Sequence, residues 1–164
     1  MATWTNPITF VVNAVLSAAQ LNANIRDNLL YLLQGRPCTV VNRTGSSDYT
    51  TTSTSFVDVD ASNLIITQYS QSGRVKLTAI FGALAAVATD FDITVDGVRG
   101  GGSAGLLRQL GASDGGSSRP IAIVFIFTGL SVGNHTFKLQ WKVDSGTGTI
   151  KNNASPIIMM AEEV

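Results

Sequence analysis

Any catalytic triad in this chain would depend on His135, because it is the only histidine. A Ser-His-Asp arrangement would have to use it, yet it sits in Gly133-Asn134-His135-Thr136-Phe137, a turn that enters a strand. No G-x-S-x-G segment offers an activated serine nearby. We therefore expect His135 to be a hydrogen-bonded structural residue, with no catalytic residues and no enzymatic activity.

Metal ligands are equally sparse. A zinc site needs three or four nitrogen or sulfur ligands, and the chain has one histidine and one cysteine, Cys38. Cys38 begins the apolar run Cys-Thr-Val-Val and is expected to be a small core residue, and a lone cysteine excludes an internal disulfide. Asp58 with Asp60, and Asp90 with Asp92, are spaced to share a strand face, as a glycosidase acid and base or a calcium site would. We expect a solvated outer face and no metal site.

A glycine cluster has the spacing of a dinucleotide-binding turn. Gly100, Gly102 and Gly105 match G-x-G-x-x-G. The strand before them alternates with aspartates, however, and no helix follows to meet a pyrophosphate. No cofactor is expected.

Trp141 alternates with lysines and glutamine on a predicted strand beside Phe137 and Leu139. Core packing is the first interpretation. A sugar-stacking role would require an exposed ring.

Composition narrows the class of protein. The 164 residues carry 11 basic and 11 acidic side chains without runs, so no nucleic-acid partner is expected. Charged residues make up 13% of the chain against 45% hydrophobic ones, which favours a β-rich oligomer over the alternative, a compact monomer with a Ser/Thr/Asn surface. We find no secretion signal at the N-terminus and no apolar run long enough to span a bilayer, so no membrane partner is expected.

The only strong helix signal runs from Ser17 to Gly35. Ser17 and Gln20 have the spacing of a capping box, and Gly35 with Pro37 provides a stop. The apolar positions form one stripe, which we name the helix stripe: Leu21, Ile25, Leu29 and Leu32.

The helix stripe predicts an assembly device, because a single helix of this length is marginal in water. Arg26 and Asp27 flank the stripe and could form ion pairs between helices, and Asn28 at its margin could select the oligomer number. An ordinary solvated helix face is the alternative for these three. Before the helix, residues 1–16 are predicted to form an extended arm with Trp4, Ile8 and Phe10 as anchors. The arm would either dock on a neighbour or pack onto its own domain.

After the helix the sequence reads as short strands divided by turn residues. We predict strands at 38–43, 50–58, 64–69, 74–84, 91–98, 121–128, 135–143, 147–151 and 157–162. The fold class is mainly β: a jelly-roll-type two-sheet sandwich preceded by an N-terminal arm and one α-helix. Residues 1–36 would form the arm and trimerisation helix, and residues 37–164 the β domain.

Two segments suggest contacts with other subunits. Ile121 to Phe127 is apolar on both faces, which predicts a partner sheet on one side and a neighbouring subunit on the other. The glycine- and serine-rich stretch 99–119 contains leucines and is predicted to lie down on a surface as a partner-facing edge.

Part of the sequence resembles a known group. Trp4, Ser17-Ala18-Ala19-Gln20-Leu21-Asn22 and Ile25-Arg26-Asp27-Asn28-Leu29-Leu30-Tyr31-Leu32 resemble an N-terminal segment of tailed-bacteriophage and prophage structural proteins. Residues 54–60, 95–97 and 130–137 look like the β domain often found behind it. Ser17 stands where threonine is commoner and keeps the capping hydroxyl.

The resemblance implies a non-enzymatic virion protein on the particle exterior, made and assembled in the bacterial cytoplasm. The first version is a homotrimeric capsid decoration or head-surface protein that contacts other virion proteins. The alternatives are a tail-fibre or receptor-binding tip that recognises a host-surface glycan, and a soluble carbohydrate-binding module. The expected assembly residues are Trp4, Phe10, Leu21, Ile25, Arg26, Asp27, Asn28, Leu29 and Leu32.

Overall fold

The computed structural model describes residues 9, 15–29, 37–84, 86–111, 117–153 and 155–164. The chain forms two compact units, Met1–Pro37 and Cys38–Val164. Of the expected assembly residues, Trp4, Phe10 and Leu32 lie outside the described residues, as do the helix stop at Gly35 and most of the arm.

The first unit begins its helix where the capping box predicts. Helix α1 (Ala18–Leu21) is capped by Ser17, whose hydroxyl accepts from the amide of Gln20, while the Gln20 side chain accepts from the Ser17 amide at 2.9 Å. The helix continues as a π-helical segment, η1 (Asn22–Arg26), and residues 27–29 are again helical. The capping prediction is confirmed, and the π-helical segment was not predicted.

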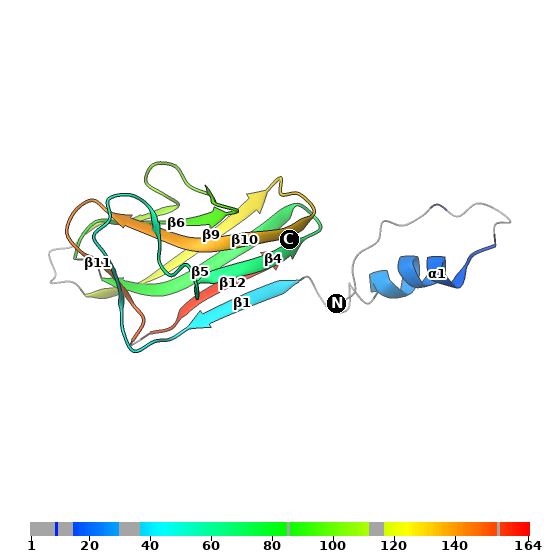
Figure 1. Ribbon diagram of the computed structural model, residues 1–164, viewed down its shortest axis with the longest axis horizontal. Helices are drawn as coiled ribbons and strands as arrows, with labels where there is room; N and C mark the ends of the chain where they lie inside the picture. The colour runs from blue at the N-terminus through cyan, green and yellow to red at the C-terminus, as the bar shows by residue number, and fades with distance from the viewer. Residues whose placement is uncertain (1–8, 10–14, 30–36, 85, 112–116, 154) are drawn as a thin grey trace. The chain divides into compact units, whose positions relative to one another are not determined.

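The second unit contains two antiparallel sheets (Figure 1). In the first sheet, the adjacent strands are β1, β12, β5 and β9, drawn in cyan, red, green and yellow in Figure 1, and β11 with β2 extends the far end of β5. The bounds in this sheet are β1 (Cys38–Arg43), β2 (Tyr49–Thr51), β5 (Arg74–Leu84), β9 (Ser118–Thr128), β11 (Gly148–Lys151) and β12 (Ile157–Glu163).

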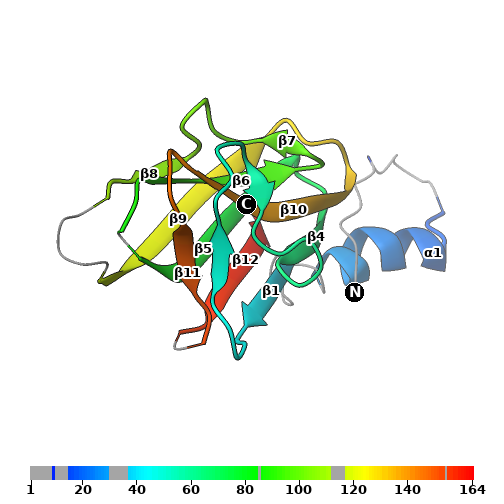
Figure 2. The ribbon, with the colours of Figure 1, turned by 60° about the vertical axis from the view of Figure 1, so that its left-hand side comes forward.

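The second sheet is built around β10 (Gly133–Val143). One edge of β10 pairs with β3 (Val57–Asp58) and β4 (Ile65–Ser70), and the other pairs with β6 (Thr89–Val95). Two short strands, β7 (Val98–Arg99) and β8 (Leu107–Gln109), pair with the outer edge of β6 (Figure 2). The chain passes repeatedly from one sheet to the other, so neighbouring strands are often distant in sequence. The predicted mainly β, jelly-roll-type two-sheet sandwich is confirmed.

The core lies between the sheets. Along β10 every second side chain points inward, and Phe137, Leu139 and Trp141 are at most 2% exposed. The opposite sheet contributes Leu77, Phe81 and Met159, and the rings of Phe81 and Phe91 pack edge to face with centroids 5.0 Å apart. The period-two pattern thus defines the inner face of both sheets.

Most predicted strands are present, and the 38–43 and 74–84 bounds agree with β1 and β5. The predicted strand 50–58 is wrong: it divides into β2 and β3, which belong to different sheets. Ser53 explains the break, because its hydroxyl donates to the carbonyl of Ser55 at 2.6 Å and accepts from the Ser55 amide at 3.2 Å. Such local bonds compete with a strand ladder.

The predicted strand 91–98 is also divided, at a tight turn. β6 ends at Val95 and β7 begins at Val98, with Asp96 and Gly97 between them at positive φ (50° and 83°). Asp96-Gly97 is a common two-residue hairpin loop for this reason.

No helix of the described part of the chain is long and apolar enough to cross a membrane.

Candidate functional site

The helix stripe is exposed in the single chain. Leu21, Ile25 and Leu29 keep 39%, 48% and 54% of their surface accessible. Burying a leucine or isoleucine side chain contributes about 1.5–3 kcal/mol of free energy. Covering the helix stripe would therefore stabilise the protein considerably. These three residues therefore form the candidate interaction site of the first unit.

The π-helical segment helps to align the stripe. Along an α-helix, positions four residues apart drift by about 40°, so Leu21 and Leu29 would diverge. The Asp27 amide instead bonds to the carbonyl of Asn22, five residues back, and this wider turn rotates less per residue. Asn24 donates its side-chain amide to the carbonyl of Gln20 at 2.9 Å, which occupies an acceptor that an α-helical bond would use.

The three polar residues beside the stripe have partners within their own chain. Arg26 Nε lies 2.8 Å from a carboxylate oxygen of Asp27, and the Arg26 side chain is 61% exposed. Asn28 is 5% exposed and donates to the carbonyl of Asn24 at 3.2 Å. Ion pairs between helices and a role of Asn28 in oligomer number stay predictions.

Cys38 corrects one prediction. It is exposed, whereas its apolar surroundings predicted a core residue. In β1 the side chains of Thr39 and Val41 turn toward the core and those of Cys38 and Val40 turn outward. Because Cys-Thr-Val-Val can satisfy either phase, the run alone did not reveal which face is covered.

His135 is a hydrogen-bonded structural residue, as predicted. Its Nδ1 lies 2.7 Å from a carboxylate oxygen of Asp96, its Nε2 lies 2.8 Å from the carbonyl of Ser131, and its side chain is 7% exposed. Hydrogen bonds to the Asp96 carboxylate and then to the Ser131 carbonyl raise the pKa of His135. Since both ring nitrogens face acceptors, the residue ties two loops together.

Asp90 and Asp92 also correct a prediction, because they are buried rather than solvated. Their exposed fractions are 1% and 0%. Asp92 accepts from the amides of Ile93 and Gly101, at 2.8 and 3.0 Å, and lies 3.4 Å from Arg99. Burial raises the pKa of the Asp92 carboxyl.

Cations and one aromatic ring cover this acidic pair. Asp90 forms ion pairs with Arg108 at 3.5 Å and with Lys142 at 3.3 Å. The Phe56 ring lies above the same face, with the Arg99 guanidinium carbon 4.4 Å and the Lys142 nitrogen 5.1 Å from its centroid. Two buried carboxylates matched by three cations attach segment 98–108 to the sheet. Among the described residues no group of three or more His, Cys, Asp or Glu side chains could hold a metal ion.

The glycine cluster has a packing role. A Cβ on Gly101 would lie 2.2 Å from the carbonyl carbon of Gly105, and Gly105 itself has a φ of 70° and approaches the carbonyl oxygen of Phe91. Leu106 and Leu107 pack against the core, while Leu110 is 68% exposed. Leu106 and Leu107 therefore pack on the chain's own core and Leu110 does not, and whether this segment faces a partner stays a prediction.

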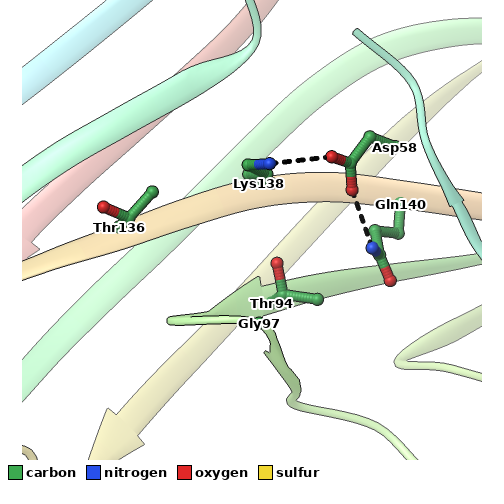
Figure 3. Close-up of a pocket in the computed structure, with 6 residues that line it drawn as sticks. All are labelled: Asp58, Thr94, Gly97, Thr136, Lys138 and Gln140. Carbon is green, nitrogen blue, oxygen red and sulfur yellow. Dashed lines mark hydrogen bonds and ion pairs between the residues drawn. The ribbon is translucent and has the colours of Figure 1, made fainter. Parts of the chain in front are cut away.

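A polar hollow of about 210 Å³ lies on the outer face of the second sheet (Figure 3). Asp58 accepts from Lys138 Nζ at 2.9 Å and from Gln140 Nε2 at 2.7 Å. Partial burial acts to raise the pKa of Asp58, but the hydrogen bonds from Gln140 and Lys138 outweigh it and hold that pKa below its usual value. Thr94, Gly97 and Thr136 complete the lining.

The remaining predicted site residues, Trp141 and Asp60, do not form a common site. Trp141 is 2% exposed, so its core-packing prediction is confirmed and its ring is not available to stack on a sugar. Asp60 lies beyond the end of β3 and does not pair with Asp58: it accepts from Tyr49 at 2.6 Å and from the amides of Ser62 and Asn63. Asp60 therefore fixes a turn.

The comparisons with known proteins add little. No family model matches this chain, and no curated protein matches its sequence. Among solved structures, the chain is similar to a T=1 particle derived from infectious bursal virus, with a TM-score of 0.41 and 7% identity. That alignment covers 77% of this chain and 35% of the other.

Sequence reasoning missed the buried ionic layer and the buried Glu163. Glu163 is 2% exposed and accepts from the backbone amides of Gln71 and Ser72. The residues of the ionic layer come from separate segments of the sequence. Pairing of β6 with β7, β8 and β10 brings Arg99, Arg108 and Lys142 together, and pairing of β3 with β10 brings in the adjacent Phe56.

Proposed function

We propose that this protein is a non-enzymatic structural component of a tailed-bacteriophage virion, a homotrimer on the particle exterior. The observation that carries the proposal is the exposed helix stripe, because Leu21, Ile25 and Leu29 remain accessible on a helix that its sequence marks for assembly. The resemblance of residues 17–32 to virion proteins supplies the context.

Capsid decoration is the version that we favour. A receptor-binding tip would gain from exposed aromatic rings that stack on sugars, yet Trp141 is buried, and among the described residues no aromatic side chain lines the polar hollow. A decoration protein needs subunit contacts and no ligand pocket. Other virion proteins would then be its partners.

The polar hollow supports one alternative, a tail-fibre tip or carbohydrate-binding module that recognises a host-surface glycan. Asp58, Lys138 and Gln140 supply the acceptor and donors that sugar hydroxyls use. Their mutual hydrogen bonds would have to be exchanged for bonds to the sugar, which reduces the gain on binding.

Assembly is tested by measuring the mass of the full chain with light scattering. We expect a trimer for the wild type and a monomer for Ile25→Asp, because the substitution places a charge in an apolar contact. The control is Ala19→Asp, an exposed residue that lies about 120° from Ile25 around the helix. A monomeric wild type, or a trimer that survives Ile25→Asp, would overturn the helix assignment.

Location is tested by immunogold electron microscopy of particles from the bacterial host with an antibody to this chain. Label on heads is expected. Label on tail tips would favour the fibre alternative, and particles without label would contradict a virion role.

A further inference from the structure

The outer face of the first sheet is apolar, which is unusual for a sandwich whose other outer face is polar. The outward side chains of β1, β12, β5 and β9 fall in register across the four strands. We call eight of them the apolar face: Val40, Thr78, Ile80, Ala122, Val124, Ile126, Ile158 and Met160. Asn42 lies beside Ile158 in the same row as Ile80, at the β1 edge. Figure 1 shows the four strands side by side.

Exposure of this face is high. Val124 is 62% exposed, Val40 55%, Ile80 45% and Ile126 42%. At one end, Ile80 and Ile158 also line an open hollow of about 340 Å³ with Pro120 and Pro156. Large apolar side chains gathered on one sheet face, with a hollow that a side chain could fill, are typical of a protein interface.

Charge restricts the kind of partner. The row at the other end of the face contains Lys76 and Glu162, whose Nζ and Oε2 atoms lie 2.5 Å apart and neutralise each other. This row therefore carries no net charge, and the two central rows offer only the side chains of Thr78 and Asn42 for hydrogen bonds to a sugar. The whole chain has a formal net charge of zero, so copies of it do not repel one another.

The area of the apolar face also restricts the kind of partner. With strands about 4.8 Å apart and outward residues about 6.8 Å apart, the eight residues of the face cover about 260 Å². A stable interface buries about 800 Å² on each partner, so this face is about a third of one and needs a second contact. The helix stripe is such a contact: β1 begins at Cys38, directly after the first unit ends at Pro37. When copies are joined through the helix stripe, their apolar faces are held at a high effective concentration relative to one another.

We propose that the apolar face docks on a second copy of this chain and forms the contact between β units in the assembly. This inference rests on the proposed homo-oligomer and extends it from the helix to the sandwich. It also explains why the strand Ile121–Phe127 is apolar on both sides.

The test measures self-association of the full chain by sedimentation over a concentration series. Val124→Lys and Val40→Lys place a charge on two different strands of the face. The matched control is Val132→Lys, since Val132 is 61% exposed and lies outside the face. We expect each face variant to weaken association about tenfold or more and the control to leave it unchanged. Thermal unfolding identifies any variant that fails to fold.

The outcomes separate this inference from the proposed function. Dissociation by Ile25→Asp together with wild-type association of both face variants would overturn the apolar face and leave the helix assignment standing. A wild-type monomer at all concentrations would overturn both. In such a monomer, hydrogen exchange at residues 21–29 that is faster in Val124→Lys than in the wild type would show that the chain's own helix covers the face. Binding to phosphatidylcholine vesicles, lost in Val124→Lys, would show a bilayer there instead.

Discussion

His135 lies with its Nδ1 2.7 Å from a carboxylate oxygen of Asp96, and this contact joins the turn after β6 to the start of β10. Asp96 also accepts from the amide of Thr136 at 2.8 Å. The hydrogen bond from Thr136, followed by that from His135, holds the pKa of Asp96 below its usual value. One carboxylate thus binds both the imidazole and the backbone of the next residue.

The first prediction concerns pH. The raised pKa of His135 means that its contribution is fully present below about pH 6.5, its unfolded pKa, and is lost as the pH rises through the folded pKa. The contribution of Asp96 is present above 3.8 and is lost as the pH falls through its lowered pKa. The melting temperature should therefore fall from pH 6 to pH 8, about the range in which histidine titrates.

His135→Gln provides the control, because His135 is the only histidine. Calorimetric scans of this variant should show a flatter dependence on pH over the same range. An equally steep decline in His135→Gln would assign the effect to another group.

The second prediction concerns the glycine cluster. Gly101→Ala should lower the free energy of unfolding by about 1–3 kcal/mol, because its Cβ would meet the backbone of Gly105. Gly102→Ala is the matched control, since nothing lies within 4 Å of a Cβ at that position. Denaturant unfolding of the two variants should separate them. Equal stability would mean that the segment shifts to make room.

The third prediction compares two adjacent glutamates on opposite faces of β12. Glu163→Ala should cost about 1–3 kcal/mol, because the backbone amides of Gln71 and Ser72 would lose the buried carboxylate that accepts from both. Glu162→Ala removes only a half-exposed pair with Lys76 and should cost at most about 1 kcal/mol. Urea titrations of both variants measure the difference, and a larger loss in Glu162→Ala would contradict the ranking.

Local sequence patterns predicted the strands of the sandwich well, but they predicted less well which outward side chains are buried. Alternation along β10 and turn residues at its ends were sufficient to place that strand, since each strand carries its own period. Cys38 and the pair Asp90–Asp92 failed for a different reason: what covers an outward side chain comes from elsewhere in the chain. Arg99 pairs with Asp92, and Arg108 and Lys142 pair with Asp90, two aspartates that alternation alone predicted to be solvated.

The helix shows the same division. Ser17 and Gln20 predicted its start because a capping box is a local device. The π-helical turn at Asn22–Arg26 depends on side-chain bonds such as Asn24 to the Gln20 carbonyl, which helical propensity does not encode.

Neighbouring methionines on β12 carry a practical consequence. Met159 is 0% exposed in the core, while Met160 points outward between Val40 and Thr78. Peroxide converts an accessible thioether to the sulfoxide and spares an enclosed one. One tryptic peptide therefore contains both Met160, whose oxidation reports its accessibility, and Met159, which serves as the internal standard. The mass shift of a single oxygen can be followed without labelling the protein.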